Sequence, residues 1–168
     1  MALRQGAVRA ELPRHRLLAC LHDYAGQYRP CDVGLGHADG GKGGHRPPAP
    51  HAVPAQMEHF VHYVNAKWHE YEAPKLAALV LWRLNHIHPF VNGNGRTARA
   101  AAYFVACLKL GGPLPGKRTL PELLCDHRAE YVHALQVADR SHLAGKPIDL
   151  QPLSKIISHL LARQIAST

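Results

Sequence analysis

Apolar residues recur every three or four positions along most of this chain, which is the spacing of one face of an α-helix. The pattern predicts helices over 12–24, 54–68, 74–87, about 95–110, 119–125, 128–139 and about 150–166. Two of these segments, 74–87 and 95–110, are apolar on more than one side. We therefore expect them to pair in the core.

Two of the other helices carry apolar stripes that make further predictions. In the segment that opens at Pro54, the stripe is formed by Met57, Phe60, Val61, Val64 and Trp68. In the last segment it is formed by Leu153, Ile156, Ile157, Leu160, Leu161 and Ile165, and Asp149 is the expected cap. This last stripe would cover the core of a monomer, whereas an exposed stripe would serve a partner or a homodimer.

The helical pattern is interrupted between residues 27 and 50. Val33 and Leu35 alternate with other residues, five glycines fall within 36–44, and prolines follow at the end of the segment. This composition predicts a short β-hairpin or an extended flap, and a loose loop is the alternative. With 168 residues, the chain fits one domain. We expect a mainly α-helical single domain of six to eight helices, spanning 1–168, with one small β-hairpin.

The formal net charge of +8 admits polyanionic partners. Lysines and arginines are nevertheless scattered, and no aromatic residues interleave with the basic cluster near the start, so nucleic acid is a secondary candidate. The four cysteines form no CxxC pair, which argues against a zinc ribbon. No apolar run is long enough to cross a membrane or to serve as a secretory signal, so we expect a soluble, cytoplasmic protein.

Residues 88–99, HPFVNGNGRTAR, fit neither a helix nor a strand pattern. Pro89 ends the preceding helix, while Gly93 and Gly95 permit backbone angles that other residues avoid. A glycine-rich loop that leads into a helix directs backbone N–H groups toward an anion, and Arg96 and Arg99 follow within the next turn. The segment therefore predicts a phosphate-binding loop.

The same twelve residues resemble the signature of the Fic family, HPFx(D/E)GNGRxxR, at every fixed position except Asn92. The likeness extends over roughly residues 12–139. The resemblance implies a helical Fic-like fold and the transfer of AMP from ATP to a Ser, Thr or Tyr hydroxyl of a target protein. It also implies that His88 is the catalytic base, a role suited to the imidazole pKa near 6.5. Pro89 and Phe90 would shape the motif, with Phe90 anchoring the loop in the core.

The remaining motif residues are implied to bind the nucleotide. Gly93, Asn94 and Gly95 would offer backbone N–H groups to the phosphates, Arg96 would clamp phosphate oxygens, and Arg99 would reach the outer phosphate. The alternatives are a simple helix-start turn and surface ion pairs. For these arginines we favour phosphate binding.

Asn92 stands where the family has its acidic metal ligand. Mg²⁺ is commonly held by carboxylates and substrate phosphates, so an amide at this position removes protein charge from the metal. Three outcomes remain open: slower AMP transfer with loosely held Mg²⁺, a different phosphate-containing substrate, or a Fic-like module that binds nucleotide or protein without transfer.

The resemblance also implies partners. The segment 27–50 occupies the place of the family's target-docking hairpin, where Val33, Gly34 and Leu35 would pair with a protein substrate. Many family members are restrained by a helix with Ser or Thr four residues before a Glu, and none of the six glutamates here has that spacing. Restraint comes from a separate antitoxin-like chain, is absent, or lies in a segment outside this sequence.

Histidine pairs raise the question of a zinc site. His86 and His88 form an HxH pair, and His59 and His62 lie one helical turn apart. A zinc site needs a third and a fourth ligand, which the sequence does not supply. We interpret these residues as structural or surface histidines, an interpretation that stoichiometric zinc in the purified protein would overturn.

Overall fold

The computed structural model describes residues 26–33 and 45–167. In this part of the chain, six α-helices, α2 to α7, follow a short 3-10 helix, η1. Their bounds are Pro50–Ala52 for η1, Val53–Lys67 for α2, Ala73–Ile87 for α3, Asn94–Lys109 for α4, Leu120–Asp126 for α5, Arg128–Leu143 for α6 and Gln151–Ile165 for α7. The mainly α-helical fold is confirmed. The helix predicted over 12–24 lies outside the described residues.

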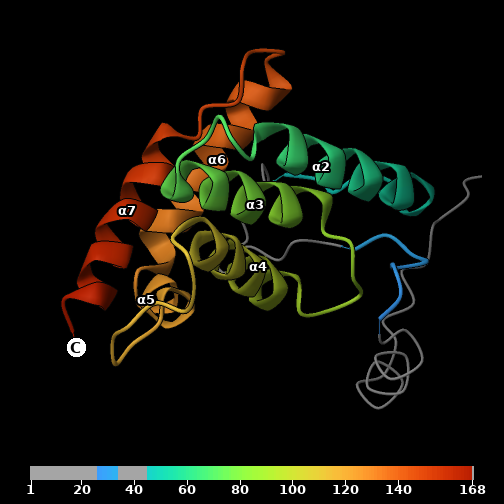
Figure 1. Cartoon of the computed structure of the whole chain (residues 1–168). Helices are drawn as coiled ribbons and strands as arrows, with labels where there is room; N and C mark the ends of the chain where they lie inside the picture. The colour runs from blue at the N-terminus through green and yellow to red at the C-terminus, as the bar shows by residue number, and fades with distance from the viewer. Residues whose placement is uncertain (1–25, 34–44, 168) are drawn as a thin grey trace, which may run out of the picture.

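Helix α3 occupies the centre of the fold, between α2 and α4, and it also contacts α6 and α7 (Figure 1). Its buried residues face every side: Ala73, Leu76, Ala77, Ala78, Leu79, Val80, Leu81, Trp82, Leu84 and Ile87. A helix that is apolar all round must be covered on all sides. The prediction that this segment lies centrally is confirmed, and its last turn leads directly into the motif loop.

Helix α4 packs on α3 through small side chains. Ala98, Ala102 and Ala106 follow one another at four-residue spacing and are fully buried, so the two helix backbones can approach closely. The predicted pairing of the two helices is confirmed. Tyr103 and Val105 of α4 also pack against the core, whereas Phe104 and Leu108 are 62% and 51% exposed.

In helix α2, one member of the predicted stripe faces the solvent. Phe60 is buried and Met57 and Val64 pack against the core, but Val61 is 51% exposed. Successive residues of a helix are about 100° apart, so Val61 lies at the edge of the stripe when Phe60 faces the core. Trp68 lies just beyond the last helical residue and still packs against the core.

Helices α5 and α6 follow the predicted order with one change of length. Thr119 and Glu122 form a capping box at the start of α5, in which the Thr119 N–H donates to Glu122 Oε2 at 2.7 Å. Helix α6 continues to Leu143, past the predicted end at 139. The apolar periodicity stops there, but the helix goes on with His142, whose ring packs edge-on against Trp82.

Helix α7 covers the core of its own chain, as predicted for a monomer. Leu153, Ile157, Leu160 and Leu161 are buried and Ile156 packs against the core, whereas Ile165, the last member of the stripe, is 42% exposed. Asp149 is not the N-cap residue, since Leu150 holds that position. Asp149 acts from one residue earlier and accepts a hydrogen bond from the Gln151 N–H at 3.0 Å.

The β-hairpin expected over 27–50 is not seen, because the described parts of that segment, 27–33 and 45–50, contain no strand. Residues 34–44 lie outside the described part. In the described end of the segment, Pro47, Pro48 and Pro50 have no N–H to donate to a ladder of backbone pairs. The described contacts of the segment include Arg29, whose N–H donates to the Pro89 carbonyl at 2.8 Å, and His45, whose Nε2 lies 2.6 Å from the His86 carbonyl oxygen.

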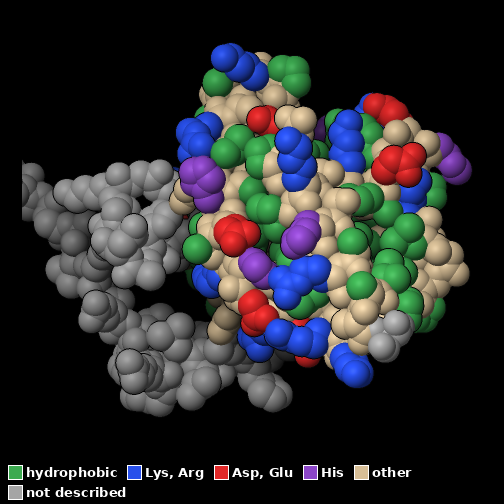
Figure 2. All heavy atoms as spheres, turned by 90° about the vertical axis from the view of Figure 1, so that its left-hand side faces the viewer, with side chains coloured by type: hydrophobic (Ala, Val, Ile, Leu, Met, Phe, Trp, Pro, Cys, Tyr) green, Lys and Arg blue, Asp and Glu red, His purple; other side chains and the backbone are tan. Residues whose placement is uncertain are grey.

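Charged side chains of both signs are mixed over the face of the molecule shown in Figure 2, where histidines also lie. No single basic stripe dominates that face. Among the described helices, none combines the length and the apolar composition needed to cross a lipid bilayer.

Candidate active site

His88 ends helix α3 in a left-handed backbone conformation. Its φ of 53° and ψ of 58° make it the one non-glycine residue with a positive φ in the described part of the chain. Pro89 explains why the helix stops, because its ring disfavours the right-handed helical conformation in the residue before it. Left-handed non-glycine residues cost energy and occur preferentially at functional sites. The turn places the His88 side chain at the edge of a groove instead of along the helix.

The imidazole of His88 is oriented by one hydrogen bond. Its Nδ1 lies 3.3 Å from the carbonyl oxygen of Asn85, which can only accept, so Nδ1 carries the proton and Nε2 keeps its lone pair. Burial lowers the pKa of His88 below its ordinary value, and the positive charge of Arg29 lowers it further. The hydrogen bond to Asn85 has the opposite, smaller effect on the pKa. The ring is therefore neutral near pH 7, as a general base requires.

The backbone of the loop is fixed from outside by Arg29, which is 2% exposed. Its Nε donates to the carbonyl of His88 at 2.8 Å, and its Nη1 donates to Cys31 at 2.9 Å. Its Nη2 donates to the carbonyl of Pro48. One buried guanidinium thus joins the motif loop to both described ends of the 27–50 segment. No sequence motif predicts this role, because it depends on the carbonyls of His88 and Pro48, which are distant along the chain.

Within the loop, Asn94 closes a ring with Phe90. Asn94 Oδ1 accepts from the Phe90 N–H and its Nδ2 donates to the Phe90 carbonyl, each at 2.8 Å. Asn94 is 4% exposed, so its amide is committed to holding the turn. Pro89 is buried, while Phe90 is half-buried and its ring lies 6.3 Å from that of Tyr28.

Gly93 precedes α4 with a φ of 82°, which favours glycine. The N–H of Gly93 donates to the amide oxygen of Asn92 at 2.6 Å. Asn92 is exposed and therefore presents its side chain at the open side of the loop.

The two motif arginines fold back over the glycines of the loop. A Cβ built on Gly93 would lie 3.6 Å from Arg96 Nη2, and one built on Gly95 would lie 3.4 Å from Arg99 Nη1. No carboxylate of the described chain lies within ion-pair distance of either guanidinium. Their charges are therefore available to an anion beside the loop.

A third arginine joins this pair. Arg99 Nη1 and Arg128 Nη1 lie 3.2 Å and 3.5 Å from the hydroxyl oxygen of Tyr131, which is 3% exposed. The tyrosine oxygen accepts from both and holds two guanidinium groups on one side of the loop. Arg128 and Tyr131 were not among the predicted site residues, because they lie on α6, far from the motif in sequence. The three-residue spacing of Arg128 and Tyr131 on one helix face was the available signal.

These residues surround one open groove of about 650 Å³. The predicted site residues that line it are Val33, His88, Asn92, Gly93, Asn94, Gly95, Arg96 and Arg99. Asp32 and Arg128 also line it, and Asp32 is the one carboxylate among the described lining residues. Gly34 and Leu35, the other two residues assigned to target docking, lie outside the described part of the chain.

Two comparisons by sequence agree with this geometry. The family model of the Fic/DOC family matches residues 12–106. The protein adenylyltransferase Fic of Drosophila mojavensis is 32% identical over 136 residues, which cover 74% of this chain and 24% of that protein. The same-named protein of Aedes aegypti is 32% identical over 145 residues, covering 78% and 26%. The chain thus spans about a quarter of the length of these curated relatives.

Solved structures show the same arrangement of helices. A Fic domain containing signaling protein from Bacteroides thetaiotaomicron superposes with a TM-score of 0.66 at 26% identity, over 84% of this chain and 53% of the other. Fic-1 from C. elegans superposes with a TM-score of 0.62 at 25% identity, over 86% and 37%. With the motif loop built as described and a family model that covers more than half of its length, this chain belongs to the Fic/DOC family.

Proposed function

We propose that this chain is a protein adenylyltransferase that moves AMP from ATP to a Ser, Thr or Tyr hydroxyl of a target protein. The observation that carries the proposal is the composition of the groove. A neutral imidazole, a glycine loop and three arginines without carboxylate partners among the described residues all line it. The curated relatives bear the name of that activity, which supports the same reaction.

In the proposed reaction, Nε2 of His88 takes the proton of the target hydroxyl while the hydroxyl oxygen attacks the α-phosphorus of ATP. A new P–O bond forms to the target, and the bond from the α-phosphorus to the bridging oxygen of the pyrophosphate breaks. The pyrophosphate leaves with the negative charge that develops on it. Arg96 and Arg99, with Arg128 beside them, offset that charge, and the backbone N–H groups of the loop orient the phosphates.

Mg²⁺ would enter this site together with ATP. The ion usually takes one or two carboxylates plus phosphate oxygens. The groove offers the Asn92 amide, now engaged with Gly93, and the Asp32 carboxylate, which fit weak protein ligation. We propose that the ATP phosphates would supply most of the oxygen ligands of Mg²⁺ and that Asn92 and Asp32 would supply the ligands from the protein. Bound there, Mg²⁺ would neutralise charge on the leaving pyrophosphate.

The protein substrate would approach along the segment that contains Val33. This residue lines the same groove as His88, so a hydroxyl-bearing segment laid beside it lies near the base. Arg29 holds the segment that contains Val33 against the motif loop, because it donates to the carbonyls of both Cys31 and His88. Pairing with Gly34 and Leu35 stays a proposal, as does an inhibitory chain that would place a glutamate against Arg99.

A second candidate is a Fic-like module that binds nucleotide or protein without chemistry, and Asn92 is the observation that favours it. The two candidates differ at His88. In the enzyme, His88→Ala abolishes transfer and leaves ATP affinity within about twofold, because the arginines and the loop remain. In the binding module, wild type and variant both bind ATP and neither labels a protein.

The experiment is incubation of the chain with labelled ATP and cell lysate, with and without Mg²⁺, beside His88→Ala and His62→Ala. His62 lies on the exposed face of α2 and serves as the matched control. We expect protein labelling by wild type and by the control variant only. If the chain binds nucleotide but labels no protein, the proposed enzyme activity is contradicted and the binding module is favoured. Salt-sensitive retention on DNA that Arg96→Ala does not change would favour a nucleic-acid binder.

A further inference from the structure

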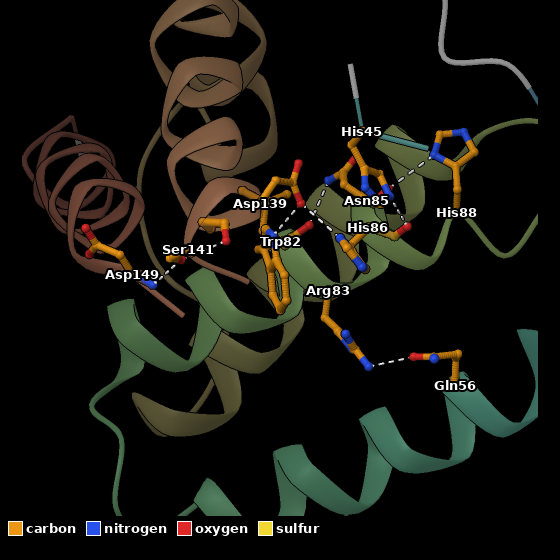
Figure 3. A network of polar contacts seen from close by, with 12 residues as sticks. His45, Gln56, Trp82, Arg83, Asn85, His86, His88, Asp139, Ser141 and Asp149 are labelled. Atoms are coloured by element: carbon orange, nitrogen blue, oxygen red, sulfur yellow. Dashed lines mark hydrogen bonds and ion pairs between the residues drawn. The ribbon is translucent and has the colours of Figure 1, made fainter. Parts of the chain in front are cut away.

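Three side chains with metal-ligating atoms meet behind the motif loop: His45 from the segment before η1, His86 from α3 and Asp139 from α6 (Figure 3). Each offers one ligand atom, and these three atoms lie within 4.8 Å of one another. His86 Nδ1 is 2.9 Å from Asp139 Oδ1, and the rings of His45 and His86 stack with centroids 4.0 Å apart. The sequence showed only His86, because the other two come from distant positions.

Neighbouring groups orient the cluster. Trp82 Nε1 donates to Asp139 Oδ1 at 3.0 Å. His45 Nε2 lies 2.6 Å from the carbonyl oxygen of His86, so Nε2 carries the proton and Nδ1 keeps its lone pair. Metal-ligating histidines characteristically donate their other ring N–H to a carbonyl or a carboxylate, which fixes the ring. His45 already has this outer contact.

The dimensions also suit an ion. Metal bonds of 2.0–2.2 Å, as in zinc sites, bring tetrahedral ligand atoms to about 3.4 Å from one another. The separations of 2.9 Å and up to 4.8 Å bracket that value. His45 lies outside any helix and can close the wider gaps without disturbing α3 or α6. The adjoining cavity of about 120 Å³ has room for the ion and a water molecule.

We propose that His45, His86 and Asp139 bind a divalent transition metal ion, Zn²⁺ in the first place, with water in the fourth position. Two imidazoles and one carboxylate select such ions over Mg²⁺, which prefers oxygen ligands. The ion would replace the proton of the hydrogen bond between His86 Nδ1 and Asp139 Oδ1.

This metal position is separate from the one that would enter with ATP, and it does not depend on the proposed transfer reaction. The ion would tie the segment of His45 to α3 and α6. His88 lines the same cavity, two residues after His86, so the ion would also brace the turn that carries the base. The role assigned to the metal is therefore structural support of the motif loop.

The test starts from the full chain stripped of metal with a chelator and titrated with Zn²⁺ in a calorimeter. We expect one tightly bound ion per chain, visible d–d absorption bands of tetrahedral type when Co²⁺ replaces Zn²⁺, and a thermal midpoint that rises on Zn²⁺ addition. His45→Ala and Asp139→Asn should each weaken binding by roughly 10- to 100-fold or more and remove the midpoint shift.

Two features keep the test decisive. His45→Ala alters no helix, and in Asp139→Asn the amide oxygen can still accept from Trp82, so both variants should keep the far-ultraviolet circular dichroism of wild type. His62→Ala, on the exposed face of α2, should bind Zn²⁺ like wild type. Zn²⁺ affinity that is equal in wild type and both cluster variants, or no stoichiometric binding at all, would overturn the proposal and leave the cluster as a hydrogen-bond network.

Discussion

At the scale of single residues, the site depends on backbone geometry as much as on side-chain chemistry. His88 is held at a φ of 53° between the end of α3 and Pro89, and Arg29 bonds to its carbonyl at 2.8 Å. A strained turn persists only when its surroundings fix it. The buried guanidinium supplies that constraint, while the motif supplies His88, the proposed base.

Asn92 is the residue at which this chain departs from the family signature. Asn92→Asp restores a carboxylate beside the phosphate groove, so we expect Mg²⁺-dependent AMP transfer to rise by about tenfold, equivalent to about 1.4 kcal/mol. Initial rates at several Mg²⁺ concentrations measure the effect, with Asn92→Ala as the control that adds no charge. Unchanged or lower activity in the aspartate variant would contradict the assignment of this position to the metal.

A substitution at Arg29 tests whether its hydrogen bonds hold the motif loop in place. Arg29→Lys keeps the charge but cannot donate at once to His88, Cys31 and Pro48, so we expect a loss of about 3 kcal/mol in the free energy of unfolding. Urea denaturation measures the loss. The matched variant Arg46→Lys, at an exposed arginine, should change it by less than about 0.5 kcal/mol. Equal stabilities would show that the guanidinium does not fix the turn.

At the scale of elements, helix ends decide where the functional groups lie. Helix α3 ends at His88, the proposed base, α4 begins at the glycine loop, and α6 begins with Arg128 at the groove. The buried alanines of α4 allow its backbone to approach α3, and hydrogen bonds from Arg29 and Asn94 hold the loop between the two helices. The start of α5 is likewise fixed by local hydrogen bonds, those of the capping box, and their contribution to stability can be tested by varying the pH.

Hydrogen bonds from the backbone N–H and the hydroxyl of Thr119 lower the pKa of Glu122. The stabilisation is present above the pKa of about 4.3 in the unfolded chain, and it is lost as pH falls through the lower folded value. Compared with Glu122→Gln, wild type should be more stable at pH 6, and the difference should vanish toward pH 3. Thermal midpoints across this range measure it. A difference that grows on acidification would contradict the assigned shift.

At the scale of the whole molecule, α7 closes the fold over α3, α5 and α6. Gln164, fully buried, accepts from the Leu120 N–H at 2.7 Å and donates to the Tyr103 hydroxyl at 2.8 Å. The chain before α5 passes so close to this point that only glycine fits at position 116. A Cβ there would lie 2.1 Å from the Gln164 carbonyl oxygen.

Gly116→Ala should therefore destabilise the fold by about 3 kcal/mol, because overpacking adds to an unfavourable φ of 121°. Gly145→Ala is the matched control, since its φ of 66° is also positive but no atom lies within 4 Å of the added Cβ. It should cost only about 1 kcal/mol. Denaturant titration of both variants separates steric contact from backbone strain, and equal losses would contradict the close approach.

Sequence patterns predicted most of the fold and the local part of the site. The all-round apolar character of α3 and the stripe of α7 correctly indicated where these helices pack. The sequence placed His88, the glycine loop and two arginines together because residues 88–99 are contiguous, while the roles of these residues remain proposals. Arg29, Arg128 and Asp139 were missed because their partners are distant along the chain. The hairpin was predicted from the alternation of Val33 and Leu35 with the glycines and prolines that follow, and this pattern does not reveal the hydrogen bonds that Arg29 donates.

The central claim is that the groove beside His88 transfers AMP. The most direct measurement is labelling of a target protein with ATP that carries the label on the α-phosphate or, in a parallel reaction, on the γ-phosphate. The account predicts protein labelling from α-labelled ATP only, with Mg²⁺ present, and its loss in His88→Ala. Labelling from γ-labelled ATP alone, labelling that persists in His88→Ala, or no labelling in either reaction would contradict it.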